Sequence, residues 1–322
     1  MILQLHRFVR APGFLMLACA LVGSSLINLF NSQRLASATT IISFDPDGPA
    51  ADVAQNVAAF DLKQGNSLFQ GIGPIINPGP AAAIVPITNY VQASVAALVD
   101  GNGQTLSVPG MANHQYQLTM VLGFSGTATL SPGGIDSYGL VAGPVNFFRL
   151  YFSQGTPAND LAGTGFATAG PPPAHMILSG ILTGASGVFL ASPGGGALDQ
   201  FGANNYPGVT SLNSVGGGQY DVAITGADPN FFVNPPPVNL QFVLANSSNI
   251  DPFLQADPSA QFYNGANLFA PAIGAVNGLG PDFQVQADAN ASFVAVPEPA
   301  SLVLAGLGLA AIAGLARRRT AS

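Results

Sequence analysis

The chain has 322 residues, of which only 7% are charged, and its formal net charge at pH 7 is −7. Residues 39–296, between the two terminal segments considered below, contain two basic residues (Lys63 and Arg149) and fourteen aspartates, a net charge of −12. That charge repels nucleic acids and anionic lipids, so we expect no nucleic-acid partner, and a disulfide scaffold is excluded because the one cysteine, Cys19, lies outside this part.

The N-terminus has the layout of a secretory signal peptide, with a basic start followed by an apolar stretch over residues 13–30. Ala36 and Ala38 form a small-x-small site, so we expect signal peptidase to cleave after Ala38 and the signal segment to comprise residues 1–38. Two alternatives stay open. The apolar stretch could remain as an uncleaved anchor, or Cys19 could be lipidated, although the residues before it make a poor lipoprotein box.

Residues 39–296 predict an exported, all-β domain. Short runs rich in Val, Ile, Thr, Tyr and Phe alternate with Gly/Pro clusters, which end regular structure. The expected strands are residues 40–44, 114–122, 145–152, 176–182, 220–225, 238–244 and 283–293. Many short strands with such connections favour a β-sandwich or jelly-roll-like domain, in one or two subdomains. Disorder is the competing interpretation, but the apolar and aromatic content is sufficient to form a core.

Three of these segments carry further information. Residues 283–293 alternate between apolar and polar side chains, which predicts a strand with one buried face. Residues 145–152 are apolar on both faces, as in a central strand. Residues 50–59 are the one plausible helix, and residues 81–99 are ambiguous because Pro86 interrupts them.

The residues that catalysis would need are scarce, so we expect no enzyme. Residues 39–296 contain two histidines, His114 and His175, which we interpret as a solvated residue at a strand edge and a loop residue. Neither an HExxH nor a GxSxG pattern occurs. A pair of aspartates acting on a glycoside remains an alternative, although fourteen aspartates make some pair inevitable.

Calcium is the more specific hypothesis for the acidic residues, and no other cofactor is indicated. Asp45 and Asp47 begin like a calcium loop, although no bidentate glutamate follows. Asp288, Asn290 and Ser292 place three oxygen-bearing side chains on one face of an expected strand. The alternative for both groups is solvated residues of turns and strands.

Glycan binding would need exposed rings beside polar side chains. Asn204, Asn205 and Tyr206 form the loop that best fits this description. Tyr138 and Tyr263 also adjoin polar or glycine positions, but the chain has no tryptophan, so packing roles are the alternative.

The C-terminus has three blocks in order. The triplet Pro297, Glu298 and Pro299 contains the only glutamate of the chain, and an uncharged run over residues 300–316 separates it from an arginine cluster, Arg317, Arg318 and Arg319. A helix over that run would extend about 25 Å, slightly short of the roughly 30 Å hydrocarbon core. The arginines would mark the cytoplasmic side. A plain C-terminal anchor or a buried helix are the alternatives.

The triplet, the apolar run and the arginine cluster together resemble the PEP-CTERM sorting signal. The resemblance implies export through the inner membrane of a Gram-negative bacterium and removal of residues 297–322 near the triplet by an exosortase, a membrane cysteine protease. It carries over to Pro297, Glu298, Pro299 and Arg317 to Arg319 only.

The body of the chain also resembles the flocculation-associated PEP-CTERM proteins. The similar stretches are residues 145–148, 161–166, 198–202, 206–208, 249–253, 276–278 and 281–283. This resemblance implies a role at the cell surface or in the extracellular matrix, through retention of exopolysaccharide in flocs or biofilm. A calcium-dependent carbohydrate-binding module is the alternative, and an enzyme acting on matrix sugars is a third.

Overall fold

The computed structural model describes residues 40–48, 54–72, 83–131, 134–154, 157–160, 162–167, 175–197, 210–233, 239–245, 262–263 and 282–294. Its elements are β1 (Ile42–Phe44), β2 (Ala54–Leu62), β3 (Gly65–Gln70), β4 (Ala83–Asp100), α2 (Pro109–Ala112), β5 (Tyr116–Ser131), β6 (Gly134–Leu140), β7 (Asn146–Gln154), β8 (His175–Ala197), β9 (Thr210–Ala227), β10 (Asn239–Ala245) and β11 (Phe283–Val294). The prediction of a β-rich domain is confirmed.

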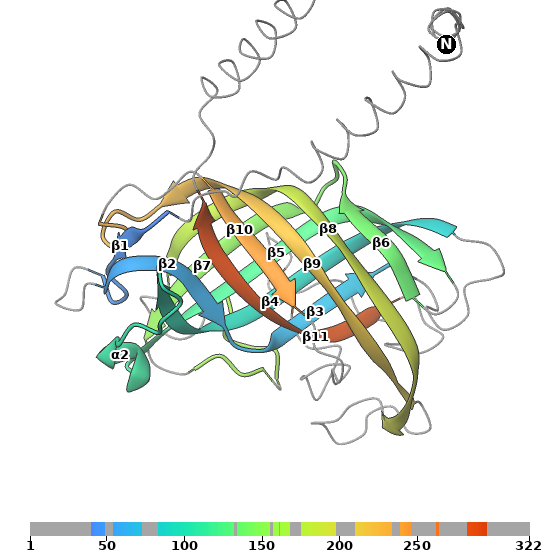
Figure 1. Ribbon diagram of the computed structural model, residues 1–322, viewed down its shortest axis with the longest axis horizontal. Coiled ribbons are helices and arrows are strands. Elements are labelled where there is room, and N and C mark those ends of the chain that lie inside the picture. The colour runs from blue at the N-terminus through green and yellow to red at the C-terminus, as the bar shows by residue number, and fades with distance from the viewer. Residues whose placement is uncertain are drawn as a thin grey trace, which may run out of the picture. The chain divides into compact units, whose positions relative to one another are not determined.

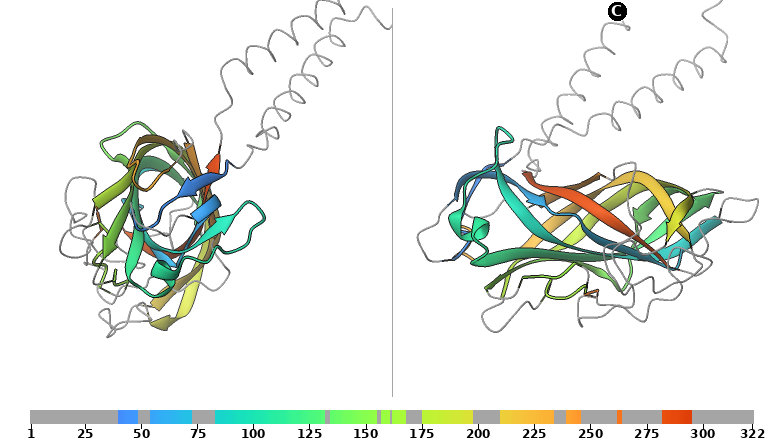
Figure 2. Two further views of the ribbon diagram at one scale, coloured as in Figure 1. Left: turned by 90° about the vertical axis from the view of Figure 1, so that its left-hand side faces the viewer. Right: turned by 90° about the horizontal axis from the view of Figure 1, so that it is seen from below.

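The strands form one antiparallel sheet that closes on itself. Its pairings follow the circuit β2, β4, β5, β7, β8, β9, β10 and β11, and β11 then pairs with β2. Figure 2 (left) shows these strands arranged around a common centre. β3 lies between β11 and β4, and β6 lies between β5 and β8. The prediction of a β-sandwich or jelly roll is therefore wrong in topology, because one sheet and not two encloses the core.

The interior of the closed sheet is packed with aromatic and aliphatic side chains from strands all around the circuit. Phe60 of β2 is fully buried between Phe44 and Phe293, with ring centroids 5.4 Å and 5.2 Å away. Each such side chain stabilises the fold by about 1.5–3 kcal/mol through burial alone. Since residues 39–296 contain no cysteine, this core takes the place of disulfides.

A second apolar cluster lies on the outer face of β3, β4, β5 and β7. We call it the outer cluster; it comprises Leu68, Tyr90, Val121, Phe147, Phe166, Ala167 and Phe262. Phe166, Ala167 and Phe262 come from connecting segments that cover the sheet at this place. β7 consequently buries apolar side chains on both faces, as the sequence predicts for residues 145–152.

Two expectations about the first half of the domain need correction. The helix predicted over residues 50–59 is wrong, because β2 occupies Ala54–Leu62 and pairs with β1, β4 and β11. Of the ambiguous residues 81–99, those from Ala83 onward belong to β4, the strand that continues to Asp100. Pro86 is tolerated in β4 because the pairing of β4 with β3 starts only at Thr88, two residues after the proline.

β3 and β6 are absent from the sequence-based prediction (Figure 1). β3 reads Gly-Asn-Ser-Leu-Phe-Gln, a small and polar start that has no strand signature. Asn66 and Ser67 are nevertheless buried, and the Asn89 side-chain amide donates to Ser67 Oγ (3.0 Å) and to the Leu68 carbonyl (3.3 Å). The hydrogen bonds offset the cost of burying these groups.

The first and last described segments of the domain are hydrogen-bonded to each other. The backbone N–H of Thr40 donates to the carbonyl of Phe293 at 2.9 Å. The division of the chain into two compact units separates Thr39–Val296 from the terminal segments Met1–Ala38 and Pro297–Ser322. Among the described residues, no helix has the length and apolar character needed to cross a membrane, and both predicted membrane segments fall outside those residues.

Candidate functional site

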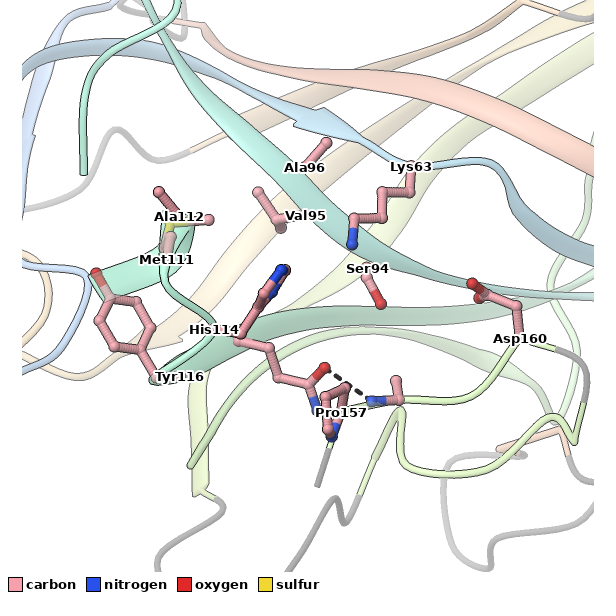
Figure 3. Close-up of a pocket in the computed structure, with 12 residues that line it drawn as sticks. Lys63, Ser94, Val95, Ala96, Met111, Ala112, His114, Tyr116, Pro157 and Asp160 are labelled. Atoms are coloured by element: carbon pink, nitrogen blue, oxygen red, sulfur yellow. Dashed lines mark hydrogen bonds between the residues drawn. The ribbon is translucent and has the colours of Figure 1, made fainter. Parts of the chain in front are cut away.

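A pocket of about 180 Å³ lies between β4, the start of β5 and two connecting segments (Figure 3). Four parts of the chain contribute to it: the link after β2, the middle of β4, the region from α2 into β5, and the segment 157–160. The lining residues are Lys63, Ser94, Val95, Ala96, Met111, Ala112, His114, Tyr116, Gln117, Pro157, Ala158 and Asp160.

Backbone hydrogen bonds position the two basic residues of the pocket, Lys63 and His114. Lys63 lies in the two-residue link between β2 and β3, where its N–H donates to the carbonyl of Ser94 at 2.8 Å. His114 follows α2 in the left-handed region, with φ 57°, and its N–H donates to the Met111 carbonyl. The exposed His114 therefore lies in a tight turn before β5 and not in the strand itself, which corrects our expectation.

Tyr116 and Gln117, the first residues of β5, also line the pocket. The ring of Tyr116 packs over Gly110, where an added Cβ would lie 2.3 Å from the ring, so only glycine fits. Gln117 Oε1 accepts a hydrogen bond from the N–H of Ala158 at 2.8 Å, and its amide donates to Ser153 Oγ at 3.0 Å. These contacts hold the segment 157–160 against the sheet.

Asp160 is the acidic group of the pocket. Burial raises the pKa of its carboxyl, while the nearby Lys63 ammonium lowers it. Its Oδ1 atom is buried and has no hydrogen-bond partner among the described residues. The main chain of Asp160 is held in place, since its carbonyl accepts from the Asn66 side-chain amide at 3.4 Å. The arrangement leaves a fixed carboxylate with unused acceptor capacity.

The predicted calcium residues lie at two separate places in the fold. Asp45 is buried and lies at the end of β1, where its N–H donates to the Phe231 carbonyl at 2.7 Å, and Asp47 lies in the following turn. Asp288 and Asn290 are exposed on β11, and Asn290 pairs with Asp61 of β2.

The surroundings of Asp288 are acidic. Burial and the neighbouring Asp61 charge both raise the pKa of Asp288. Within the part of the chain that the structure describes, no three His, Cys, Asp or Glu side chains come together as a metal site. Calcium binding stays a prediction.

The glycan loop Asn204, Asn205 and Tyr206 lies outside the described residues. Of the other tyrosines considered, Tyr138 is buried in the core, where its hydroxyl lies 3.2 Å from that of Tyr220, so an exposed stacking role for it is wrong. Tyr263 packs at the edge of the outer cluster. Its hydroxyl accepts a hydrogen bond from Arg149, whose guanidinium lies 5.2 Å from the Tyr263 ring centroid.

The predicted cleavage site, Ala36 and Ala38, and the C-terminal blocks also fall outside the described residues. The comparison with protein families decides the C-terminus: the PEP-CTERM protein-sorting motif matches residues 295–319. The chain carries a PEP-CTERM sorting signal. Searches of the curated proteins and of the solved structures gave no match.

The PEP-CTERM match spans the triplet Pro297, Glu298 and Pro299, the apolar run, and the arginine cluster from Arg317 to Arg319. The chain is therefore an exported protein that an exosortase processes, as the sequence predicts. The pocket is the part that sequence reasoning missed. One signal pointed to it, since Lys63 is one of only two basic residues in residues 39–296.

Proposed function

We propose that the domain of residues 39–296 is a non-enzymatic matrix protein that retains exopolysaccharide around Gram-negative cells and so promotes flocs or biofilm. The observation that carries the proposal is the sorting motif at residues 295–319, which directs the chain to the cell surface. The resemblance of the body to flocculation-associated proteins supports the narrower role.

The construction of the domain suits an extracellular position. The described residues form a phenylalanine-rich core within a closed sheet, and residues 39–296 contain no cysteine for a disulfide. The net charge of −12 disfavours adhesion to anionic lipid and nucleic acid, and it leaves neutral and cationic polymers as the compatible partners.

The test compares cells that make the protein with cells that lack it. The measured quantity is the ratio of cell-associated to released polysaccharide, together with the settling rate of the culture. Loss of the protein should release polysaccharide and slow settling, and reintroduction should restore both. Equal polysaccharide retention in the two strains would contradict the proposal.

A calcium-dependent carbohydrate-binding module is a second candidate, favoured by the juxtaposition of Asp61 and Asp288 on paired strands. A divalent cation there would relieve the repulsion between the two carboxylates. If calcium raises the melting temperature of the exported protein and Asp288→Asn removes the increase, the calcium-dependent form is supported. An unchanged melting temperature would rule it out.

A further inference from the structure

We propose that the pocket between Lys63, His114 and Asp160 binds one neutral sugar residue of an exported polysaccharide. The inference rests on the proposed function for the source of the ligand, whereas the chemistry of the ligand follows from the pocket.

The pocket holds Lys63 and His114, two of the four Lys, Arg and His side chains in residues 39–296. Of the other two, Arg149 is already engaged: it donates to the Tyr263 hydroxyl and lies 5.8 Å from the Phe147 ring centroid. Figure 3 shows the Lys63 amine and the His114 ring turned toward the same space, and both side chains are exposed. Solvent-facing donors are thus concentrated at this place.

Acceptors and donors face that space together. Asp160 Oδ1 is a buried acceptor without a hydrogen-bond partner among the described residues, and an unsatisfied acceptor of this kind needs a donor. A sugar hydroxyl can donate to Asp160 and accept from Lys63 at the same time. Ser94 adds a hydroxyl to the lining, and Figure 3 shows it beside the Lys63 amine.

The pocket also has the apolar surface that a sugar ring needs. Val95, Met111 and Pro157 line the same pocket and offer contact to the C–H face of a pyranose ring. A volume of about 180 Å³ is below the roughly 300–1,000 Å³ of sites for drug-sized ligands, so the pocket accepts a single ring.

Charge selects the neutral sugar over an acidic one. Lys63 and Asp160 compensate each other within the pocket, and the domain around them has a net charge of −12. A uronate would meet both the Asp160 carboxylate and this wider negative potential, whereas a neutral hexose would meet neither penalty.

Sugar binding can be measured by NMR through the His114 ring. Residues 39–296 contain only His114 and His175, so the proton NMR spectrum of the processed protein contains two histidine Hε1 signals, which a His175→Gln variant assigns. The probes are methyl glucoside, methyl galactoside and methyl mannoside, with methyl glucuronide for comparison. We expect at least one neutral glycoside to shift the His114 signal to saturation, and methyl glucuronide to bind more weakly. No shift with any neutral glycoside, or tighter binding of the glucuronide, would overturn the inference.

Variants locate the site. Asp160→Asn removes the anionic acceptor and should weaken glycoside binding about tenfold. Asp288→Asn makes the same change in net charge on β11, outside the pocket lining, and should leave binding unchanged. Ala112→Trp fills the pocket from an exposed position and should abolish binding while the melting temperature stays at the wild-type value. This variant decides the question if Asp160→Asn does not fold.

The two proposals fail separately. Polysaccharide retention by a protein whose Ala112→Trp variant binds glycosides normally would overturn the pocket and leave the matrix role intact. Glycoside binding that Ala112→Trp abolishes, in cells that lose no polysaccharide without the protein, would support the pocket and contradict the matrix role.

Discussion

The N–H of Thr40 lies 2.9 Å from the carbonyl oxygen of Phe293, so the two ends of the described domain are hydrogen-bonded to each other. The segment that follows the predicted signal peptide and the segment that leads to the sorting motif therefore join the closed sheet at one place.

The aromatic core predicts a large loss of stability for Phe60→Ala. Phe60 is buried and contacts the Phe44 and Phe293 rings, so truncation removes apolar burial and leaves a cavity. We expect the free energy of unfolding to fall by about 3–5 kcal/mol, measured by urea denaturation of the exported protein. Ile84→Ala is the control, because Ile84 is 74% exposed and its truncation should change stability by less than about 0.5 kcal/mol. Equal losses in the two variants would contradict this account of the core.

The buried tyrosine pair predicts loss of stability at alkaline pH. Burial raises the pKa of Tyr138 to about 12, and burial also raises the pKa of Tyr220. Because an unfolded tyrosine ionises near pH 10, the unfolded state binds fewer protons than the folded state above that pH. The stabilisation is complete below pH 10 and is lost as the pH rises toward 12, at up to about 1.4 kcal/mol per pH unit for each tyrosine.

Unfolding free energy measured from pH 8 to pH 12 checks this behaviour. Tyr138→Phe should lose the hydrogen bond to Tyr220, about 0.5–1.5 kcal/mol at neutral pH, and should show a shallower alkaline decline. A decline as steep in the variant as in the wild type would show that other groups control alkaline stability.

Arg149 and Tyr263 predict a measurable coupling between β7 and the segment 262–263. The pair combines a hydrogen bond with a guanidinium stacked 5.2 Å from the ring centroid. A double-mutant cycle with Arg149→Met and Tyr263→Leu should give a coupling energy of about 1 kcal/mol, from thermal or urea unfolding. Additive losses, within about 0.3 kcal/mol, would mean that the two side chains do not stabilise each other.

The sorting triplet predicts a processing defect when its acid is removed. Glu298 is the only glutamate of the chain and lies within the matched motif. Glu298→Gln keeps the size of the side chain but not its charge, and we expect the uncleaved precursor to accumulate in the membrane fraction, measured by immunoblotting. Ser301→Ala, inside the same matched region, should be processed normally. Normal processing of Glu298→Gln would separate the triplet from recognition.

The pattern of polar and apolar residues was enough to predict a strand with two different faces, residues 283–293, and a strand with two buried faces, residues 145–152. In β11 the predicted alternation of buried and accessible side chains holds from Asp288 to Phe293, whereas Gln284 and Gln286 are buried, so the first half of the strand is covered on both faces. β7 is apolar on both faces because Phe166 and Phe262 cover its outer side. The helix predicted at residues 50–59 failed for a non-local reason. β2 gains hydrogen bonds from strands on both sides, and those partners are distant in the sequence.

The closure of the sheet and the pocket could not be predicted either, because both depend on residues that are distant in the sequence. The pairing of β11 with β2 joins the two ends of the domain, and no periodicity within either segment encodes it. Lys63, His114 and Asp160 likewise come from three separate segments, and only the fold brings them together. The terminal motif could be recognised in full because its three blocks are contiguous in the chain.

The central claim is that this chain is exported and cut at its sorting motif. The most direct measurement is the intact mass of the protein recovered from the cell surface and the medium. The account predicts a mass that lacks the apolar run and the arginines Arg317 to Arg319. A surface protein that still carries those arginines would contradict it.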